Sequence, residues 1–224
     1  MLASVPRVTG NRNKSEVVEA IGFFPAVLAY LWFFLIPLPW TGVALLSVVA
    51  ASWWQRSHTV ESLGLGWRAL GDSFRQWGPL WVICILPFLF FGYRTLFRLS
   101  TLERGLVYFA WSAAQQVVYQ SMMYLPLRGG LRSARLAAGL SGVAFALVHA
   151  PNPILVPGTL LWGIASSLLF EQCRSVWGLA LLQVMLSSML MWITPPGLHR
   201  GFTIGPFYHQ PPPVPFAPPI VLDR

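Results

Sequence analysis

The chain has 224 residues, of which 55% are hydrophobic and only 10% are charged, and its mean hydropathy is +0.60. Soluble domains carry about 25% charged residues, so this composition excludes an ordinary soluble domain and predicts an all-α, polytopic transmembrane helical bundle. The net charge of +8 does not indicate a nucleic-acid partner, because the basic residues lie between apolar runs, where Lys and Arg flank membrane helices.

About seven apolar segments are candidates for membrane helices, although several are shorter than the roughly 20 residues of a lone span. They are residues 19–37, 41–54, 78–92, 105–127, 136–149, 157–172 and 176–193. Residues 1–16 form a polar N-terminal segment without a small-residue cleavage site, so the first apolar run is expected to remain as an anchor. We predict one domain, a membrane bundle over residues 17–193.

Residues 55–77 separate the second and third apolar segments and have a different pattern. Charged residues alternate there with apolar residues at near-helical spacing: Arg68, Asp72 and Arg75 among Leu63, Leu65, Trp67, Leu70, Phe74 and Trp77. The pattern is typical of an amphipathic helix in the membrane interface. This helix is either a gate or lipid sensor, or a connector that rests on the headgroups.

The arginines suggest an orientation for the bundle. The N-terminus, residues 55–77 and residues 128–135 would face the cytoplasm, and residues 150–156 and the tail would lie outside. Three arginines conflict with this scheme, because it places them outside: Arg94, Arg98 and Arg104.

Residues 194–224 are rich in proline and include the run PPPVPFAPP at 211–219. Because proline at this density breaks helices, we expect an extended or disordered tail. The tail could alternatively be a polyproline II ligand for a partner domain.

Polar side chains lie deep inside the apolar segments of the second half of the chain. They are Ser112, Gln115, Gln116, Tyr119 and Gln120 in the fourth segment, His149 and Asn152 around the end of the fifth, where Phe145 precedes them, and Gln183, Ser187 and Ser188 in the seventh. Gln116 and Gln120 share one helix face because they are four residues apart. Amides that faced lipid would stay unpaired, so we expect these faces to turn inward, where the glutamines would pair with each other, Tyr119, His149 and water.

Three short motifs resemble those of the CAAX protease and bacteriocin-processing family, which includes the Ras-converting enzymes. The family carries Glu-Glu-x-x-x-Arg, Phe-x-x-x-His and His-x-x-x-Asn or Asp on successive membrane helices. This sequence has QQVVYQ at 115–120, FALVH at 145–149 and QVMLS at 183–187. The resemblance covers roughly residues 60–190, and it is to bacterial members, which implies an integral protein of the bacterial cytoplasmic membrane.

In this family a glutamate and a histidine activate the water that attacks a peptide carbonyl, and a histidine and an asparagine stabilise the oxyanion. The resemblance implies catalytic positions at Gln115, Gln116, His149, Gln183 and Ser187, and substrate-binding positions at Tyr119, Gln120, Phe145 and Asn152. Of the motif residues, Phe145 and His149 match the family, whereas glutamine or serine stands at the others.

A glutamine cannot accept a proton near neutral pH, so His149 would be the sole base. We therefore predict an intramembrane peptidase homologue that is inactive or altered in hydrolysis and that still binds a membrane-anchored or lipidated peptide within the lipid bilayer. No cofactor is expected, and one His without carboxylate or Cys partners falls short of a metal site. Cys84 and Cys173 lack ligand spacing and are interpreted as small hydrophobic residues.

The alternative is a non-enzymatic membrane protein, either a binding or scaffold protein or a small transporter whose glutamine faces line a pathway for a polar solute. Inverted repeats would favour a transporter, and the sequence shows no repeat.

Overall fold

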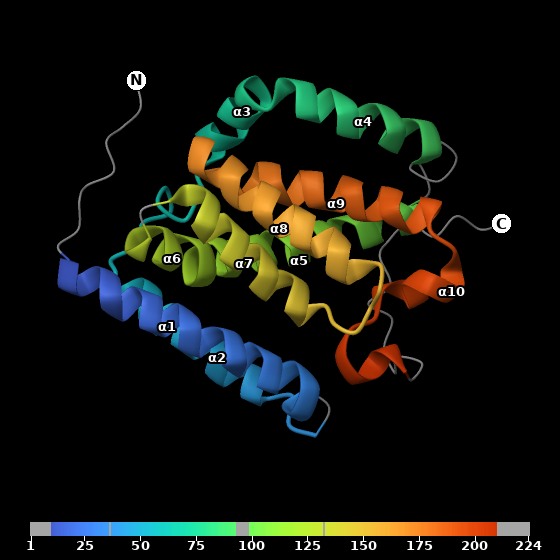
Figure 1. Ribbon diagram of the computed structural model, residues 1–224. Helices are drawn as coiled ribbons and strands as arrows, with labels where there is room; N and C mark the ends of the chain where they lie inside the picture. Colours follow the sequence, from blue (N-terminus) through green and yellow to red (C-terminus); the bar gives the residue numbers. More distant parts are fainter. Residues whose placement is uncertain (1–9, 36, 93–98, 132, 210–224) are drawn as a thin grey trace.

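The computed structural model describes residues 10–35, 37–92, 99–131 and 133–209, and all regular secondary structure within these ranges is helical (Figure 1). The predicted all-α bundle is confirmed. Within the same ranges, Ser15–Phe34 and Val176–Ile193 are long and apolar enough to cross a membrane, and Gly78–Phe90 and Ala134–Val148 are shorter apolar helices. The count of seven spans stays a prediction.

Within the described ranges, each apolar segment of the sequence is mainly helical. The elements are α1 (Gly10–Ala29) with a π-helical turn (Tyr30–Phe34), α2 (Thr41–Gln55), α3 (Trp67–Gln76), α4 (Gly78–Gly92), α5 (Leu99–Tyr119) with a π-helical turn (Gln120–Tyr124), α6 (Leu125–Gly130), α7 (Ala134–Val148), α8 (Leu155–Gln172), α9 (Val176–Ile193) and α10 (Pro196–His199). Two 3-10 turns follow, Arg200–Phe202 and Gly205–Tyr208.

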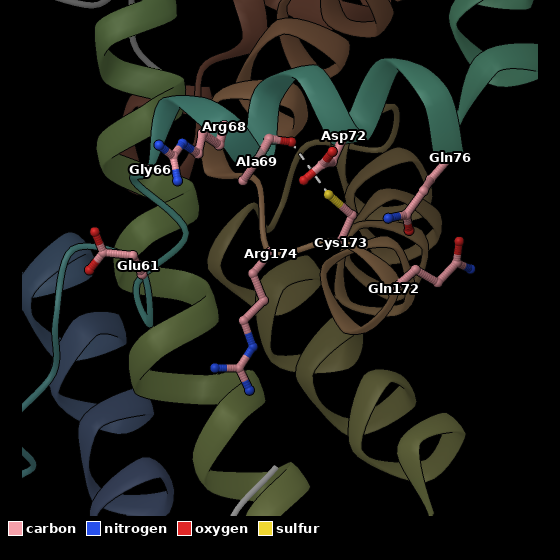
Figure 2. Close-up of a pocket in the computed structure, with 9 residues that line it drawn as sticks. All are labelled: Glu61, Gly66, Arg68, Ala69, Asp72, Gln76, Gln172, Cys173 and Arg174. Atoms are coloured by element: carbon pink, nitrogen blue, oxygen red, sulfur yellow. Dashed lines mark hydrogen bonds between the residues drawn. The ribbon is translucent and has the colours of Figure 1, made fainter. Parts of the chain in front are cut away.

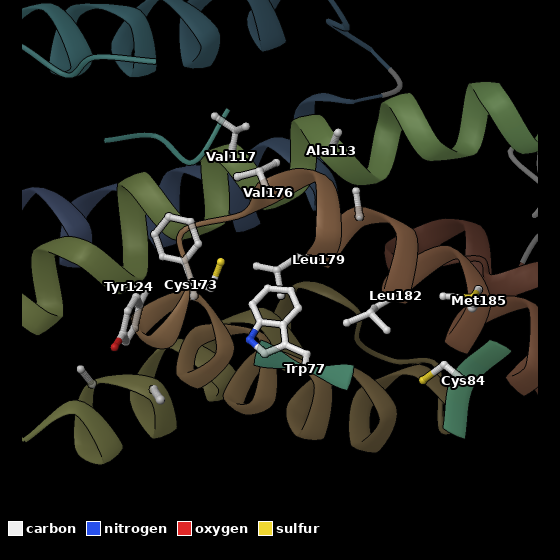
Figure 3. Packing of buried hydrophobic residues seen from close by; sticks show 14 of the residues in the cluster. Trp77, Cys84, Ala113, Val117, Tyr124, Cys173, Val176, Leu179, Leu182 and Met185 are labelled. Atoms are coloured by element: carbon white, nitrogen blue, oxygen red, sulfur yellow. The ribbon is translucent and has the colours of Figure 1, made fainter. Parts of the chain in front are cut away.

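Helix α9 is the centre of the bundle, with α3, α4, α5 and α8 packed against it. Its side chains Leu179 and Leu182 are fully buried and point into the core beside Trp77 (Figure 3). Cys84 and Cys173 are free thiols in the same core, which confirms their interpretation as small hydrophobic residues. By contrast, α1, α2 and α4 expose large apolar side chains outward, which suits a lipid environment.

The helices that carry the candidate site have defined starts. Ser133 Oγ accepts a hydrogen bond from the Leu136 amide at 3.2 Å, and Ser175 Oγ accepts one from the Gly178 amide at 3.1 Å. Each serine satisfies an amide that lacks a partner within its helix, and so fixes where α7 and α9 begin.

The prediction of one helix across residues 55–77 is wrong, because helix α3 covers only Trp67–Gln76 and residues 56–66 form turns. The reason is a tertiary contact at Gly64, whose carbonyl accepts a hydrogen bond from the Val176 amide at 2.9 Å. Gly64 has a φ of 77° there, a conformation that glycine adopts without steric cost. The amphipathic part of the prediction holds for α3, which buries Ser73 and exposes Arg68, Asp72 and Arg75.

The prediction of an extended or disordered chain from residue 194 onward is wrong for residues 196–208, which form α10 and two 3-10 turns. The Gly205 amide donates to the Ala150 carbonyl at 2.8 Å, so this segment packs on the α7–α8 loop. Pro196 and Pro206 stand at the starts of these short helices, where a missing amide proton costs nothing. The run at 211–219 lies outside the described residues.

Candidate functional site

Four glutamines join α5, its π-helical turn and α9 through side-chain hydrogen bonds. Gln120 Nε2 donates to Gln116 Oε1 at 3.1 Å, Gln116 Nε2 donates to Gln183 Oε1 at 2.7 Å, and Gln183 Nε2 donates to Gln115 Oε1 at 2.6 Å. We call this chain of amides the glutamine network. It brings together the first and third motifs, as the sequence predicts, and each amide supplies the donor that a carboxylate would lack.

The glutamine network is buried and also includes a residue that the sequence did not indicate. Gln116 and Gln120 are almost completely inaccessible. Trp162 of α8 donates from Nε1 to Gln183 Oε1 at 3.0 Å, so this oxygen accepts two hydrogen bonds. A tryptophan in an apolar run is expected to serve packing, and no sequence signal marks Trp162 as part of a polar site.

Gln120 stands at the first position of the π-helical turn Gln120–Tyr124. Such turns are inserted into α-helices mostly at functional sites. Gln120 Oε1 is buried and has no hydrogen-bond partner among the described residues, and the same holds for Ser112 Oγ, one helical turn before Gln116. The row Ser112, Gln116 and Gln120 therefore retains free hydrogen-bonding capacity at both ends.

Tyr119, Phe145 and His149 form a second row beside the glutamine network. The ring centroids of Tyr119 and Phe145 are 4.7 Å apart, and those of Phe145 and His149 are 4.8 Å apart with the rings edge to face. Tyr119 OH donates to the Gly163 carbonyl at 3.0 Å and lies 3.1 Å from Ser167 Oγ. Tyr119 thus links α5 to both α7 and α8.

His149 has its Nδ1 atom 2.7 Å from the Phe145 carbonyl oxygen. Since a carbonyl can only accept, Nδ1 carries the proton and Nε2 is left as an acceptor. The expectation that His149 and Tyr119 pair with the glutamines is wrong, because within the described ranges both bind α7 or α8 instead. His149 Nδ1 is satisfied by a carbonyl one helical turn earlier, and the Tyr119 hydroxyl is satisfied by α8, so neither group needs a glutamine partner.

Ser187 and Asn152, the remaining polar candidates, have partners outside the glutamine network. Ser187 shares a side-chain hydrogen bond with Tyr108 of α5. Asn152 Nδ2 donates to the carbonyls of His199 and Thr203 at 3.0 and 3.1 Å, and its Oδ1 accepts from the amides of Ile154 and Leu155. The amide of Asn152 therefore uses all of its hydrogen bonds on backbone groups of the chain.

The carboxylates of the described residues lie away from the glutamine network and His149, either paired with other groups or exposed. Glu171 accepts hydrogen bonds from Tyr124 OH at 2.7 Å and Arg128 Nε at 2.9 Å, and Glu19 pairs with Arg56. Hydrogen bonds between a carboxylate and the glutamine network or His149 do not occur within the described ranges. The described residues also contain no group of three or more His, Cys, Asp or Glu that could hold a metal ion.

A pocket of about 300 Å³ lies between α3 and the turn that joins α8 to α9, and we call it the α3 pocket (Figure 2). Most of the residues that line it have polar side chains; the lining residues are Glu61, Gly66, Arg68, Ala69, Asp72, Gln76, Gln172, Cys173 and Arg174. Burial, with a further contribution from Asp72, raises the pKa of the Cys173 thiol to about 11, so this cysteine is unreactive. None of these residues belongs to the three motifs. Arg68 and Asp72 lie in the amphipathic stretch that the sequence places at the interface, but the sequence did not indicate a pocket there.

Comparison with known proteins gives one family for the site region. Residues 105–189 match the family model described as type II CAAX prenyl endopeptidase Rce1-like. The matched region runs from α5 to α9 and contains the glutamine network together with Tyr119, Phe145 and His149. No curated protein and no solved structure matches the chain.

Proposed function

We propose that the protein is a peptide-binding homologue of the Rce1-like type II CAAX prenyl endopeptidases with altered chemistry, since residues 105–189 match that family model. This family consists of integral membrane proteases. In our proposal the chain spans the bacterial cytoplasmic membrane as a bundle of about seven segments. It holds a membrane-anchored, lipidated peptide beside His149 and does not hydrolyse it by glutamate–histidine chemistry.

The glutamine network supports this proposal, because amides stand where the family has its catalytic glutamates. General-base catalysis needs a group that takes a proton from water near neutral pH, and an amide does not. His149 Nε2 is an acceptor, but no carboxylate among the described residues orients the ring or stabilises its charged form. A positioned base contributes about 10²–10⁴-fold to a rate, so hydrolysis without it is severely slowed.

Peptide binding is supported by the acceptor that His149 leaves free. Within the described ranges His149 uses only Nδ1 in a hydrogen bond, so Nε2 remains available to a donor. Peptide amides are donors, and an apolar environment strengthens the hydrogen bonds that they make. A peptide whose lipid anchor stays in the bilayer would present such amides at the depth of the site.

The test combines cleavage and crosslinking with full-length protein in nanodiscs and a prenylated peptide that carries a photoreactive group. We expect the parent protein to crosslink to the peptide without cleaving it. Replacing His149 by Ala is expected to weaken crosslinking at least threefold. The matched control is Leu147→Ala, which changes an exposed side chain of the same helix and should leave crosslinking unchanged.

Cleavage by the parent protein that disappears in His149→Ala would overturn the proposed lack of hydrolysis. Absence of crosslinking in both proteins would overturn peptide binding. A triple variant, Gln115→Glu with Gln116→Glu and Gln183→His, restores the two glutamates of the first motif and the histidine of the third. Cleavage by this variant alone is the result expected if the glutamines are what prevents hydrolysis.

A further inference from the structure

The α3 pocket has firmly held walls. Trp67 stacks on Trp177 with ring centroids 4.7 Å apart, and Trp177 Nε1 donates to the Leu65 carbonyl at 2.8 Å. Cys173 Sγ donates to the Ala69 carbonyl at 3.4 Å (Figure 2). A Cβ atom at Gly64 would lie 3.0 Å from the Arg174 carbonyl oxygen, so the two turns are in close contact. The shape of the pocket is therefore set before any ligand binds.

The charged side chains of this pocket are not paired with each other. Glu61, Arg68, Asp72 and Arg174 make no side-chain hydrogen bond or ion pair within the part of the chain that the structure describes. Arg68 and Asp72 are four residues apart on α3, a spacing at which ion pairs commonly form. In Figure 2, Glu61 and Arg68 lie toward one end of the pocket and Gln76 and Gln172 toward the other, with Asp72 and Cys173 between them.

We propose that the α3 pocket binds a zwitterionic phospholipid headgroup that carries both a phosphate and a primary ammonium. Arg68 is the guanidinium on α3, Glu61 and Asp72 supply two carboxylates, and the Arg174 side chain runs away from α3 (Figure 2), so a bare phosphate would meet repulsion from Glu61 and Asp72. A ligand with both signs of charge satisfies both kinds of group. About 300 Å³ is at the lower end of ligand sites, which suits a headgroup and not a large molecule.

The position of α3 explains why this ligand would be a lipid. Charged residues on α3 keep it out of the hydrocarbon, while Trp67 and Phe74 of the same helix are 69% and 45% exposed. Exposed aromatic side chains next to charged residues are typical of the headgroup layer. A pocket on this helix would therefore lie at the depth of the lipid headgroups. This inference does not depend on the proposed peptide binding.

The experiment uses full-length protein in detergent and native mass spectrometry with an equimolar mixture of phosphatidylethanolamine, phosphatidylcholine and phosphatidylglycerol. We expect phosphatidylethanolamine to be the preferred adduct. Arg68→Gln should reduce that adduct about tenfold, since a charge-assisted hydrogen bond is lost. Asp72→Asn should remove the preference over phosphatidylcholine, whose quaternary ammonium cannot donate a hydrogen bond. Arg75→Gln, on the same helix but outside the pocket, is the matched control. It should change neither the amount of the phosphatidylethanolamine adduct nor its preference over phosphatidylcholine.

Equal binding of the three lipids, or an equal effect of Arg68→Gln and Arg75→Gln, would overturn the proposal, since either shows non-specific charge attraction. A second arm adds soluble glycerophosphoethanolamine at the concentration of the lipid. Failure to displace the lipid adduct supports a headgroup whose acyl chains add to binding. Displacement by the soluble compound supports the same pocket chemistry with a soluble zwitterion as the ligand. The variants change exposed side chains, and an unchanged thermal midpoint verifies that each is folded.

Discussion

Gln183 has the largest number of hydrogen bonds in the glutamine network, since it accepts from Gln116 and Trp162 and donates to Gln115. A buried amide of this kind fixes the relative positions of α5, α8 and α9 more specifically than apolar packing can. The arrangement also needs amides. With a carboxylate at position 116, the donor to Gln183 Oε1 would be missing.

Replacing Gln183 by Leu is expected to lower the free energy of unfolding by about 3 kcal/mol, because the donors of Gln116 and Trp162 lose their acceptor in a buried site. Unfolding in detergent, followed by circular dichroism, measures the change. Gln172→Leu, at an exposed position of α8, is the matched control and should stay within about 0.5 kcal/mol. Equal stability of the two variants would show that the glutamine network does not hold these helices together.

His58, in the turn after α2, makes stability depend on pH. Burial lowers its pKa below the usual 6.5, and the nearby Arg56 and Arg174 lower it further. Its Nε2 atom is buried without a partner among the described residues, so nothing there accepts a second ring proton. As the pH falls, the unfolded chain takes up the proton first, so stability is lost from pH 6.5 downward through the folded-state pKa.

We therefore expect the thermal midpoint to fall between pH 7 and pH 5 and His58→Gln to remove part of that fall. Thermal unfolding in detergent at several pH values measures both. The exposed His209 is the comparison position, and His209→Gln should leave the profile as it is. An identical profile in His58→Gln and in the parent would contradict the assignment.

At the scale of elements, α7 and α8 pack closely because both present small residues to each other. Ala137, Ala138, Ser141, Ser166 and Ser167 have almost no accessible surface. A Cβ atom at Gly142 would lie 3.0 Å from the Ile164 amide nitrogen and 3.1 Å from the Leu160 carbonyl oxygen. Small residues let helix backbones approach, which is how membrane helices gain packing contacts. The close packing of α7 and α8 also places Gly163 beside Tyr119, and so positions the ring contacts from Tyr119 through Phe145 to His149.

Gly142→Ala is expected to destabilise the protein by about 2 kcal/mol, because the added methyl group meets backbone atoms that cannot rotate away. Gly139→Ala is the matched variant on the same helix, with open space around its Cβ, and should be neutral or slightly stabilising. Denaturant unfolding of the two proteins gives the difference. A stable Gly142→Ala protein would mean that α7 and α8 can separate at little cost.

At the scale of the whole molecule, the segment after α9 closes one end of the bundle (Figure 1). Asn152 holds it through the His199 and Thr203 carbonyls, and the same side chain accepts from the amides at the start of α8. Arg200 stacks over the Tyr208 ring at 4.8 Å and donates to its carbonyl at 2.7 Å. One buried asparagine therefore joins the C-terminal segment to the loop that follows His149.

The variant Asn152→Asp distinguishes the hydrogen bonds that Asn152 donates to the C-terminal segment from those that it accepts at the start of α8. The carboxylate keeps the acceptor for the α8 amides, but it loses the donors to His199 and Thr203 and faces their carbonyl oxygens in a buried site. We therefore expect tryptic cleavage after Arg200 to rise at least fivefold and global stability to fall by about 4 kcal/mol. Asn152→Ala loses both sets and should fall by about 3 kcal/mol. Limited proteolysis and thermal unfolding distinguish the two. Equal cleavage of Asn152→Asp and the parent would show that other contacts retain the segment.

Contacts far apart in sequence account for the differences between expectation and structure. The helical spacing of apolar residues over 55–77 could not predict the hydrogen bond from the Val176 amide to the Gly64 carbonyl, where the chain turns. Proline density gave no indication that Asn152 would hold the chain after residue 194. Neither Trp162 in the glutamine network nor the α3 pocket has a sequence signal, because each depends on how α8 lies against its neighbours.

The amino-acid sequence was enough to predict an all-helical bundle, the places of its apolar helices and the inward orientation of the glutamines on α5 and α9. These follow from local rules: apolar composition, helical periodicity and the cost of an unpaired amide in apolar surroundings. Tertiary structure alone decided which groups pair. In the folded chain, Gln183 forms hydrogen bonds with Gln115 and Gln116, and His149 forms one with the Phe145 carbonyl. Residues 196–208 pack where Asn152 donates to the His199 carbonyl. A side chain's partner depends on which helices are neighbours and on their rotation, and spacing within one helix fixes neither.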